Sequence, residues 1–429
     1  MPQSIALLES QPRIGGRLMT AKSMNGDNIE LGAMRISTRH NEVIKLCQDL
    51  DIKLVPFNAN INNSAHFFYA NLESQNPIIT NESASSMIGK CAARYAGLPF
   101  FEPSLTQQIF SRMLSKMNKK KIGVESLTIS EWLELIATNT EKEMIISAFG
   151  YDHLALRDIS FTSCISNATG HSTHENFLRP LNGMESIAEA IHQKFIESKG
   201  IYIPNFSVAT ILKSGSSITL ISEDNRIIEA SKIIFAIPPK AIKSIRNIRE
   251  VIGNRLHTRL DDIGSYASSK TYFSFSNQNT YKIPFNKDGY FRTNRFARLG
   301  HWNPVPSLSL RNYRTILASY RLSSRVDTHE FSSDEDLDKK ILKDIQTLLN
   351  QNIDDPFEKI SYDWLASKSS VSAHYWQKNC NPQSILSEFT MLSPWVHFIG
   401  EAFCWEHGWI ESAIISTQSA LQRIDHSTS

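Results

Sequence analysis

The chain has 429 residues, of which 41% are hydrophobic and 21% are charged, values that are ordinary for a folded globular protein. This length exceeds the usual ~100–200 residues per domain and predicts two or three domains. The formal net charge of only +2 excludes the strongly basic field by which a protein binds nucleic acid or a charged membrane surface.

The first third of the chain alternates short strands with one helix. SIALLES (4–10), which is mostly apolar and carries Glu9 near its end, predicts a strand buried on both faces. HNEVIKLCQDLDI (40–52) carries apolar residues at helical spacing, and IKLVPF (52–57) predicts a strand. The Asn- and Ser-rich stretch 58–86 favours hairpins or loops over a helix.

The pattern turns helical between about residues 103 and 199. Thr128 and Glu131 form a candidate capping box ahead of an apolar stripe. NGMESIAEAIHQKFIES (182–198) predicts an amphipathic helix. Its buried stripe is expected to hold Met184, Ile187, Ile191 and Phe195.

Short β-like runs follow between residues 201 and 239. The last of them, Ile233–Ile237, is continuously apolar, stops at a proline pair and predicts a buried strand. SSKTYFSFSN (268–277) and YRTILASYRL (313–322) alternate as strands do, and residues 334–349 have a helical pattern.

The C-terminal piece predicts one strand and one helix. The strand should end at Gly400–Glu401, and the helix should start near Gly408. The buried stripe of this helix is expected to consist of Ile410, Ala413, Ile414, Thr417, Leu421 and Ile424.

Cysteine usage and hydropathy bear on the compartment. Five scattered cysteines favour reduced thiols over a disulfide framework. No apolar run approaches the ~20 residues of a membrane span, and the N-terminus lacks the pattern of a secretory signal. We therefore expect a cytoplasmic protein that binds neither membranes nor nucleic acid.

The first 20 residues contain two features of a nucleotide site. An acid that ends a second strand can bind both ribose hydroxyls of an adenine nucleotide, and Glu9 has that position. In RIGGR (13–17), paired glycines let the backbone approach a ligand, and two arginines suit a diphosphate. A solvated glutamate and a plain glycine turn would leave the same local pattern. A glycine-rich loop belongs about 20 residues before such an acid, so we expect this loop to lie outside the given chain.

Three stretches at matching separations carry a family resemblance. RIGGRLMT…IELGAMRIS, VATILKSG…IIFAIPP and FIGEAFCWEHGWIESAI together resemble the flavin-containing amine oxidases. Within them, ELGAMR and HGWIES resemble the L-amino-acid oxidase branch. The overall layout, including FGYDHL, is similar to that of the bacterial tryptophan oxidases.

The resemblance implies an α/β fold with α+β elements. A discontinuous, Rossmann-like FAD-binding domain would be accompanied by a mixed-sheet substrate domain and a helical insert. The FAD-binding domain, without its first strand and phosphate loop, would comprise residues 1–57, 196–260 and 390–429. The substrate domain would comprise residues 58–102 and 261–389, and the helical subdomain residues 103–195.

The resemblance also implies which residues bind FAD. Glu9 would hold the adenosine ribose, and Val208 would meet the adenine through its backbone. The diphosphate and neighbouring flavin contacts would come from Arg13, Gly15, Gly16 and Arg17. The isoalloxazine ring would lie close to Gly32, Ala33, Met34 and Arg35. Gly400 and Glu401 would contact the ribityl–phosphate region. Trp409 and Ile410 would contact the pyrimidine edge of the flavin, where the positive end of a helix suits an anionic reduced flavin.

Substrate and catalytic roles follow in the same way. Arg35 would select the substrate class, because a guanidinium binds a carboxylate through two hydrogen bonds; a structural salt bridge is the alternative. Lys270 matches the family's lysine, which holds a water near flavin N5 for reoxidation by O2. Candidate walls of the substrate pocket are Trp376 and Trp409, with a core position as the alternative for Trp376. His301 or Trp302 would replace the tyrosine that helps the arginine in related oxidases.

Together these roles imply an FAD-dependent oxidase that converts an L-amino acid, with aromatic ones as candidates, to its imino acid and reduces O2 to hydrogen peroxide. The alternatives are an amine oxidase for a monoamine or polyamine, and a truncated, inactive homologue that does not bind FAD. The expected partners are the small-molecule substrate and O2, with a homodimer as a further candidate. No metal is expected, because GHSTHENF, with His171, His174 and Glu175, favours an ordinary loop.

Overall fold

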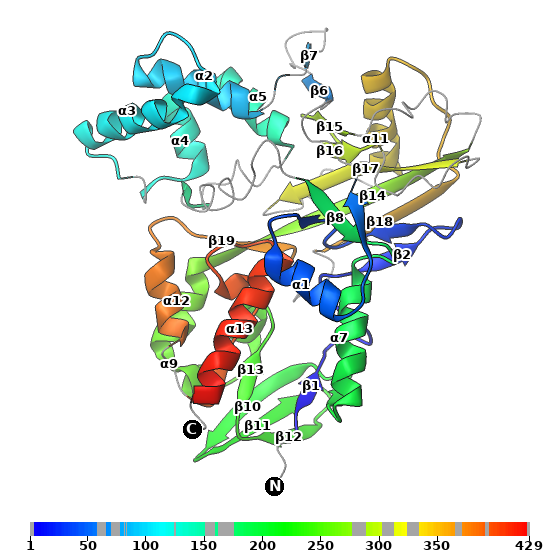
Figure 1. The fold of residues 1–429 in the computed structure, drawn as a ribbon, viewed down its shortest axis with the longest axis vertical. Helices are drawn as coiled ribbons and strands as arrows, with labels where there is room; N and C mark the ends of the chain where they lie inside the picture. Colours follow the sequence, from blue (N-terminus) through cyan, green and yellow to red (C-terminus); the bar gives the residue numbers. More distant parts are fainter. Residues whose placement is uncertain are drawn as a thin grey trace.

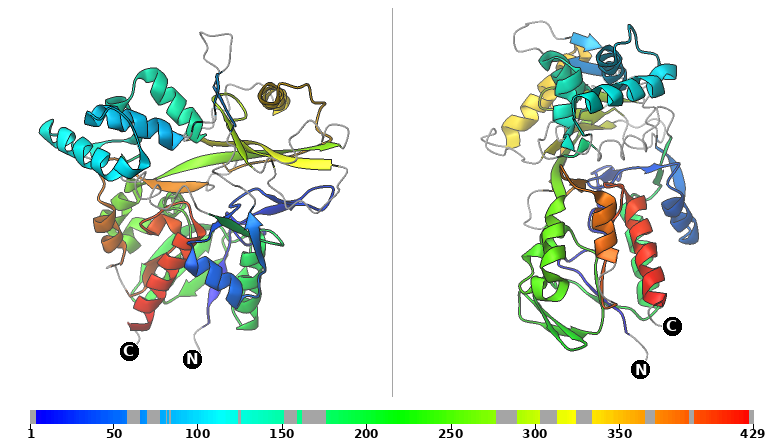
Figure 2. Two further views of the ribbon diagram at one scale, coloured as in Figure 1. Left: turned by 45° about the horizontal axis from the view of Figure 1, so that its top comes forward. Right: turned by 90° about the vertical axis from the view of Figure 1, so that its left-hand side faces the viewer.

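The computed structural model describes residues 4–57, 66–69, 78–80, 82, 84–123, 126–150, 159–161, 176–276, 289–302, 313–323, 334–364, 371–390 and 394–426. These residues form an elongated molecule with two parts, and both chain ends lie in the lower part (Figure 1). The helices at the opposite end are well separated from the termini in the side views (Figure 2). None of the described helices combines the length and apolar character needed to cross a membrane.

Parallel strand pairs bring distant stretches of the chain together in the lower part. β1 (Ala6–Leu8) pairs with β9 (Ile201–Ile203), and β13 (Ile233–Phe235) pairs with β20 (Val396–Phe398). A three-stranded antiparallel sheet of β10 (Val208–Ser214), β11 (Ser217–Ser222) and β12 (Ile227–Ala230) lies beside them (Figure 1). This part is therefore assembled from three stretches that are far apart in sequence.

The prediction that strands β1 and β13 are fully buried is wrong. Ile5 is 67% exposed and Leu7 is 41% exposed, because β1 is hydrogen-bonded to β9 and no other described strand pairs with its second edge. In β13, Ile233 and Phe235 are buried but Ile234 between them is exposed. A continuous apolar run requires cover on both faces to be buried, and each of these two-stranded pairs lacks part of that cover.

Six helices complete the lower part. They are α1 (Asn41–Asp49), α7 (Glu185–Glu197), α8 (Pro239–Ser244), α9 (Ile248–Arg259), α12 (Pro382–Thr390) and α13 (Ile410–His426). The 3-10 turns η4 (Leu260–Asp262) and η6 (Glu401–Phe403) precede β14 and α13. The helices predicted at 40–52, 182–198 and after Gly408 are confirmed by α1, α7 and α13.

The predicted buried stripes of two helices are wrong in part. In α7, Met184 and Ile187 are buried, but Ile191 is 44% exposed, because the apolar cluster reaches only the first turns. In α13, Leu421 is 49% exposed, and the buried face carries Ser412, Ser416 and Ala420 instead. Small side chains on this face let the helix approach its neighbours closely, whereas a hydropathy pattern counts serine as a solvent-facing residue.

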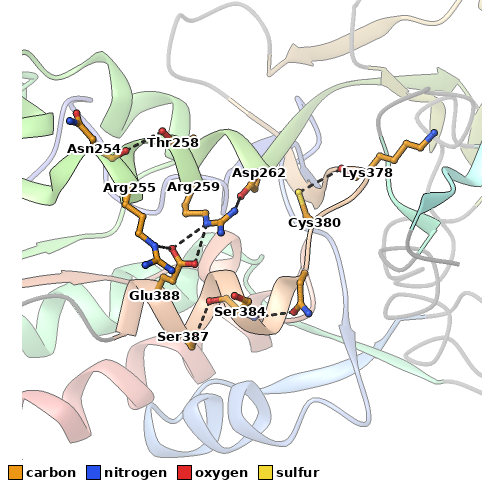
Figure 3. A network of polar contacts seen from close by, with 11 residues as sticks. Asn254, Arg255, Thr258, Arg259, Asp262, Lys378, Cys380, Ser384, Ser387 and Glu388 are labelled. Atoms are coloured by element: carbon orange, nitrogen blue, oxygen red, sulfur yellow. Dashed lines mark hydrogen bonds and ion pairs between the residues drawn. The ribbon is translucent and has the colours of Figure 1, made fainter. Parts of the chain in front are cut away.

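A charged cluster ties α12 to α9 (Figure 3). The Glu388 carboxylate accepts hydrogen bonds from Arg255 Nε at 2.9 Å and from Arg259 Nε at 3.1 Å. Arg259 also pairs with Asp262 at 3.0 Å. Hydrogen bonds from the two guanidinium groups lower the pKa of Glu388 to about 2.

A large mixed sheet organises the upper part. Its strand order is β18 (Glu358–Asp363), β14 (Ile263–Ser276), β17 (Tyr313–Ser323), β16 (Leu299–His301), β15 (Tyr290–Thr293), β6 (His66–Tyr69) and β7 (Ile78–Thr80). β19 (Ala373–Trp376) pairs with the start of β14, so this long strand connects the two parts. Helix α11 (Asp334–Leu349) covers one face of the sheet (Figure 1). Hairpins or loops were expected within 58–86: the antiparallel pair β6–β7 agrees with this, whereas residues 84–86 begin helix α2.

A helical cluster lies beside this sheet. It consists of α2 (Ala84–Ala96), the 3-10 turn η1 (Pro103–Leu105), α3 (Thr106–Lys119), α4 (Ile129–Ile136) and α5 (Asn139–Phe149). The capping box predicted at α4 is confirmed: Glu131 N donates to Thr128 Oγ1 at 3.1 Å, and Thr128 N donates to the Glu131 carboxylate at 2.9 Å.

Three helices pack across the predicted domain boundaries. α2 packs on α3, α4 and α5 rather than on the large sheet. α7 shares a buried cluster with α1, and α12 shares the core of the lower part with β13 and β20. The boundaries followed changes in sequence pattern, whereas packing partners decide which unit a helix joins.

Short strands fill the junction between the two parts. The hairpin β2 (Thr20–Lys22) and β3 (Asn28–Glu30) lies next to the sheet β4 (Ile36–Ser37), β8 (Phe177–Pro180) and β5 (Leu54–Phe57). One buried cluster joins side chains of β3, β8, β14 and β15 across this junction. Cys47, Cys91, Cys380 and Cys404 are free thiols.

Candidate functional site

Residues 30–33, here called the central strap, run through the junction from the end of β3 and bend at Leu31 and Gly32. The backbone amides of the central strap are hydrogen-bonded to residues 17–19: Leu31 N donates to Met19 O at 2.9 Å, and Ala33 N donates to Arg17 O at 3.0 Å. At Gly32 the two backbones are so close that an added Cβ would lie 1.9 Å from Arg17 O. The central strap therefore requires glycine at position 32.

The carbonyl edge of the central strap is held by side chains of β14. Lys270 Nζ donates to Glu30 O at 3.0 Å and to Gly32 O. Tyr272 OH donates to Glu30 O at 2.8 Å. Lys270, which was predicted to be catalytic, thus lies against the segment that was predicted to pass close to the flavin.

The Lys270 amine is buried and lies 5.0 Å from the centre of the Tyr320 ring. Burial disfavours its charged form and lowers its pKa to about 7; the charge of Glu30 opposes this shift and that of Arg35 adds to it. At neutral pH the amine is therefore balanced between its protonated and neutral forms, which suits a group that holds or releases a proton.

Arg35 lies beside this amine and contacts two aromatic side chains. Its Nη1 donates to Tyr290 OH at 2.6 Å, and its guanidinium carbon lies 4.3 Å from the centre of the Phe177 ring. The ring of His301, which is opposite Tyr290 in the β15–β16 register, lies 4.8 Å from the Tyr290 ring. The tyrosine that accompanies Arg35 is therefore Tyr290, a residue that the sequence did not indicate because it lies 255 positions away.

The structure corrects the prediction for two tryptophans, which are buried in cores. Trp302 packs on Phe291 at 4.4 Å in the cluster that α11 covers, because strand side chains alternate and His301 takes the opposite face. Trp376 donates from Nε1 to Trp405 O at 3.1 Å within the core of the lower part. Neither ring belongs to the buried cluster that surrounds Arg35 and Lys270.

The start of α13 lies next to the central strap. The Trp409 ring packs against the cluster that contains Met34, and it meets the His40 ring edge-on at 4.8 Å. Ile410 and Ala33 pack on the cluster that α7 and α1 share. These predicted flavin neighbours are brought together from opposite ends of the chain.

Glu401 is a buried carboxylate with three partners. Its Oε1 contacts Arg17 Nη1 and His374 Nδ1, and its Oε2 accepts from Gly408 N at 2.7 Å. Burial opposes the charged form, but attraction to His374 and Arg17 outweighs it and holds the pKa of Glu401 well below its ordinary value. Burial also lowers the pKa of the neighbouring His407 to about 4. The cluster joins two predicted cofactor regions that are 384 residues apart.

The turn at residues 13–18 is organised by Arg13. Its Nη1 donates to Leu18 O at 3.1 Å and pairs with Glu185 of α7 at 3.2 Å. Gly15 has a φ of +94°, and a Cβ there would lie 2.8 Å from Leu18 O, so glycine is required. Both arginines of this turn have protein partners, since Arg13 orders the turn and Arg17 neutralises Glu401.

Glu9 and Val208 lie together at the carboxyl end of the β1–β9 pair. The Glu9 side-chain carboxylate accepts a hydrogen bond from Gln11 N at 2.8 Å, and the Glu9 backbone carbonyl accepts one from Phe206 N at 2.8 Å. β10 begins two residues later, at Val208. Their proximity suits the predicted contacts to one adenosine, which stay a prediction.

The backbone leaves room for a large ligand at two predicted contact points. No heavy atom lies within 4 Å of the Cβ position at Gly16 or Gly400, and Gly400 has a φ of +116°. Bare backbone of this kind lets a flat or polyanionic group approach the main chain. With the glycine-containing turn and the central strap nearby, these residues fit the diphosphate and flavin portions of FAD. Among the residues that the structure describes, no group of three or more His, Cys, Asp or Glu could hold a metal ion; His171, His174 and Glu175 lie outside them.

Replacement of Glu401 by glutamine should destabilise the fold strongly. The change leaves the Arg17 guanidinium without its buried counter-charge, and we expect the free energy of unfolding to fall by about 3–5 kcal/mol at pH 7. Because the folded pKa of Glu401 is lowered, this contribution is present above the ordinary value of 4.5 and is lost as the pH falls. Guanidinium unfolding at pH 7 and pH 4 measures both effects. Glu134→Gln, which breaks the surface pair with Lys142, is the control and should cost ~1 kcal/mol or less; equal losses would contradict the assignment.

Comparison with known proteins agrees with this architecture. The sequence matches the family described as flavin containing amine oxidoreductase over residues 2–424. Cyclohexylamine oxidase from Brevibacterium oxydans IH-35A has a similar structure, with a TM-score of 0.71 and 15% identity over 100% of this chain and 95% of that chain. Wild-type putrescine oxidase bound to putrescine gives a TM-score of 0.70 and 15% identity over 100% of this chain and 94% of that chain.

Identity at this level shows a shared fold alone, and no curated protein sequence matches the chain. The predicted resemblance to the flavin-containing amine oxidases is confirmed by the family match, whereas the L-amino-acid oxidase branch stays a prediction. The chain therefore belongs to the flavin-containing amine oxidoreductases, mixed α/β flavoproteins whose cofactor is FAD.

Proposed function

We propose that this protein is an oxidase that converts an L-amino acid to its imino acid and passes the electrons to O2, giving hydrogen peroxide. The observation that carries the proposal is the pair formed by Arg35 and Tyr290 next to Lys270. The pair supplies a carboxylate receptor beside the residues that are predicted to face the flavin.

Arg35 is held in a defined orientation by its two aromatic contacts. A hydroxyl at 2.6 Å and a ring below the guanidinium plane limit its rotation. A guanidinium held in this way forms two parallel hydrogen bonds to a carboxylate, which would fix the α-carbon of an amino acid in register. An amine without a carboxylate gains nothing from this receptor.

FAD, held by the residues that are predicted to bind it, would supply the redox chemistry for oxidation at the α-carbon. The residues of the chain bind, orient and exchange protons. Arg35 and Tyr290 hold the carboxylate, and the neighbouring aromatic side chains exclude water from it. Lys270, fixed by two strap carbonyls, holds or releases a proton at Nζ.

A monoamine or polyamine oxidase is the second candidate. It is favoured by the structural neighbours, whose names give putrescine and cyclohexylamine as substrates. At 15% identity, these neighbours do not indicate which substrate the pocket of this chain binds. An inactive homologue that does not bind FAD is the third candidate.

Substrate pairs that differ only by a carboxylate separate these candidates. We expect the purified protein to show the absorbance bands of oxidised flavin and to release hydrogen peroxide with L-phenylalanine, L-tryptophan or L-ornithine. For the active amino acid, kcat/KM should exceed that of the matched phenethylamine, tryptamine or putrescine by on the order of 10²-fold or more. Faster turnover of the amines would favour the second candidate. A folded, colourless protein that added FAD does not stabilise would favour the third.

A further inference from the structure

We propose that Glu30 is a positioning residue for Lys270: it fixes where the Lys270 amine lies and controls the proton that this amine holds. The kinetic consequence rests on the proposed oxidase function, whereas the structural coupling does not. Glu30 is held at two points, through its side chain and through its backbone carbonyl.

The Glu30 side chain is anchored on the amino end of α7. Its Oε1 accepts from Met184 N at 2.9 Å, and its Oε2 accepts from Thr20 Oγ1 at 2.9 Å. The Thr20 hydroxyl in turn accepts from Glu185 N at 3.1 Å. Helix α7 has no side-chain cap at its own N-cap position, so Glu30 and Thr20 satisfy its first amides and place a carboxylate at its positive end.

The Glu30 carbonyl faces the other way and holds the amine. It accepts from Lys270 Nζ at 3.0 Å and from Tyr272 OH at 2.8 Å. Thr20 and Glu30 are direct partners in the β2–β3 ladder, so the side-chain anchor and the carbonyl belong to one rigid hairpin. Release of the carboxylate from α7 would therefore displace a carbonyl that positions Lys270.

Glu30 and Lys270 are also coupled by charge. Burial raises the pKa of Glu30 to about 7, against hydrogen bonds from Met184 and Thr20 and the attraction of Lys270 and Arg179. Lys270 titrates in the same range, with Glu30 favouring its charged form and Arg35 disfavouring it.

The remaining groups that face this pair come from β14 itself and from three other strands. Arg179 lies on β8, and burial lowers its pKa to about 10 while Asp27 and Glu30 raise it. Tyr272 on β14 and Tyr290 on β15 interact with one another, and burial raises the pKa of Tyr272 above its ordinary range. Tyr320 on β17 presents its ring to the amine. In the described part of the chain, Glu30 is the one carboxylate whose charge shifts the pKa of Lys270.

The first test is a double-mutant cycle on unfolding of the full chain, which does not depend on activity. Glu30→Gln and Lys270→Met are combined, and the free energy of unfolding is measured at pH 5, 7 and 9. We expect the two changes to be non-additive at pH 7, by roughly tenfold or more in the unfolding equilibrium constant. Glu185→Gln is the matched control, because Glu185 belongs to the same anchor but pairs with Arg13; its cycle with Lys270→Met should be additive. Additive behaviour of Glu30→Gln as well would overturn the proposal.

The second test uses the flavin-loaded enzyme and the pH profile of its reoxidation by O2. Removing the negative charge of Glu30 lowers the pKa of Lys270, so Glu30→Gln should move the profile to lower pH by about 1 unit or more. Glu30→Asp keeps the charge but shortens the anchor, so it should weaken stability and leave the profile near that of the wild type. If Glu30→Gln and Glu30→Asp moved the pH profile by the same amount, Glu30 would act only as a cap of helix α7. A protein that fails to oxidise any amine would refute the proposed function, while the unfolding cycle would still report on the pair.

Discussion

Replacement of Lys270 by methionine is expected to slow reoxidation of the reduced enzyme by O2 by roughly 10²–10⁴-fold. Reduction by substrate should change only a few-fold, because Arg35 and Tyr290 stay in place. The physical reason is the position of the amine, which is buried and held by carbonyls of the central strap. Rapid mixing of substrate with oxidised enzyme, and of O2 with reduced enzyme, measures the two half-reactions separately.

Lys359→Met is the matched control for this change. Lys359 lies on the neighbouring strand β18 and pairs with Asp338 near the surface, so both half-reactions should be unaffected. If Lys270→Met slowed both half-reactions equally, Lys270 would act through the shape of the pocket and not through proton handling.

Lys270→Met should also change how the free energy of unfolding depends on pH. Burial lowers the pKa of Lys270 from 10.5 to about 7, so between these values the unfolded chain binds a proton that the folded chain lacks. Folding is therefore favoured as the pH rises through this window. Lys270→Met should flatten the dependence between pH 7 and pH 10 in denaturant titrations; an unchanged slope would contradict a lowered pKa.

Substitution of Arg35 by glutamine is expected to lower kcat/KM for an L-amino acid by on the order of 10²–10³-fold, as loss of a buried charge-assisted pair predicts. The matched decarboxylated amine should change by less than about tenfold, since it makes no bond to the guanidinium. Steady-state assays of hydrogen peroxide release with both members of each pair measure the difference.

Tyr290→Phe provides a graded comparison for Arg35. It removes the hydroxyl that Arg35 Nη1 contacts at 2.6 Å but retains the ring, so about a tenfold loss is expected for the amino acid alone. If Arg35→Gln reduced turnover of amino acid and amine equally, Arg35 would support the fold of the pocket and the second candidate function would gain.

Local signals in the sequence predicted many elements correctly. The capping box at Thr128 and the helix at 334–349 match the structure, and the strand that was expected to end at Gly400–Glu401 ends slightly earlier, at Phe398. Each is encoded by residues a few positions apart, through a cap, a helical repeat or a turn. Burial was less predictable: Ile5, Ile191 and Leu421 are exposed because cover depends on which elements lie above them.

The candidate site shows the same limit. Arg17 and Glu401 were each expected near the cofactor, but nothing in the local sequence shows that they form one buried pair with His374. Tyr290 carries no distinctive motif, and nothing in the ELGAMR stretch singles out Glu30; their roles follow from partners that are 255 and 240 residues away. Trp302 and Trp376 had the right residue type for a pocket wall and lie in cores instead.

The sequence by itself determined the family and the order of the elements, and it predicts which residue types face the cofactor. These depend on short motifs and on periodicity, which are written along the chain. Only the tertiary structure decided that Lys270 is a buried amine with a pKa near 7, that Arg35 is paired with Tyr290, and that Glu30 joins α7 to the central strap. Burial and charge–charge energies depend on distances between residues that are remote in sequence, and folding alone sets those distances.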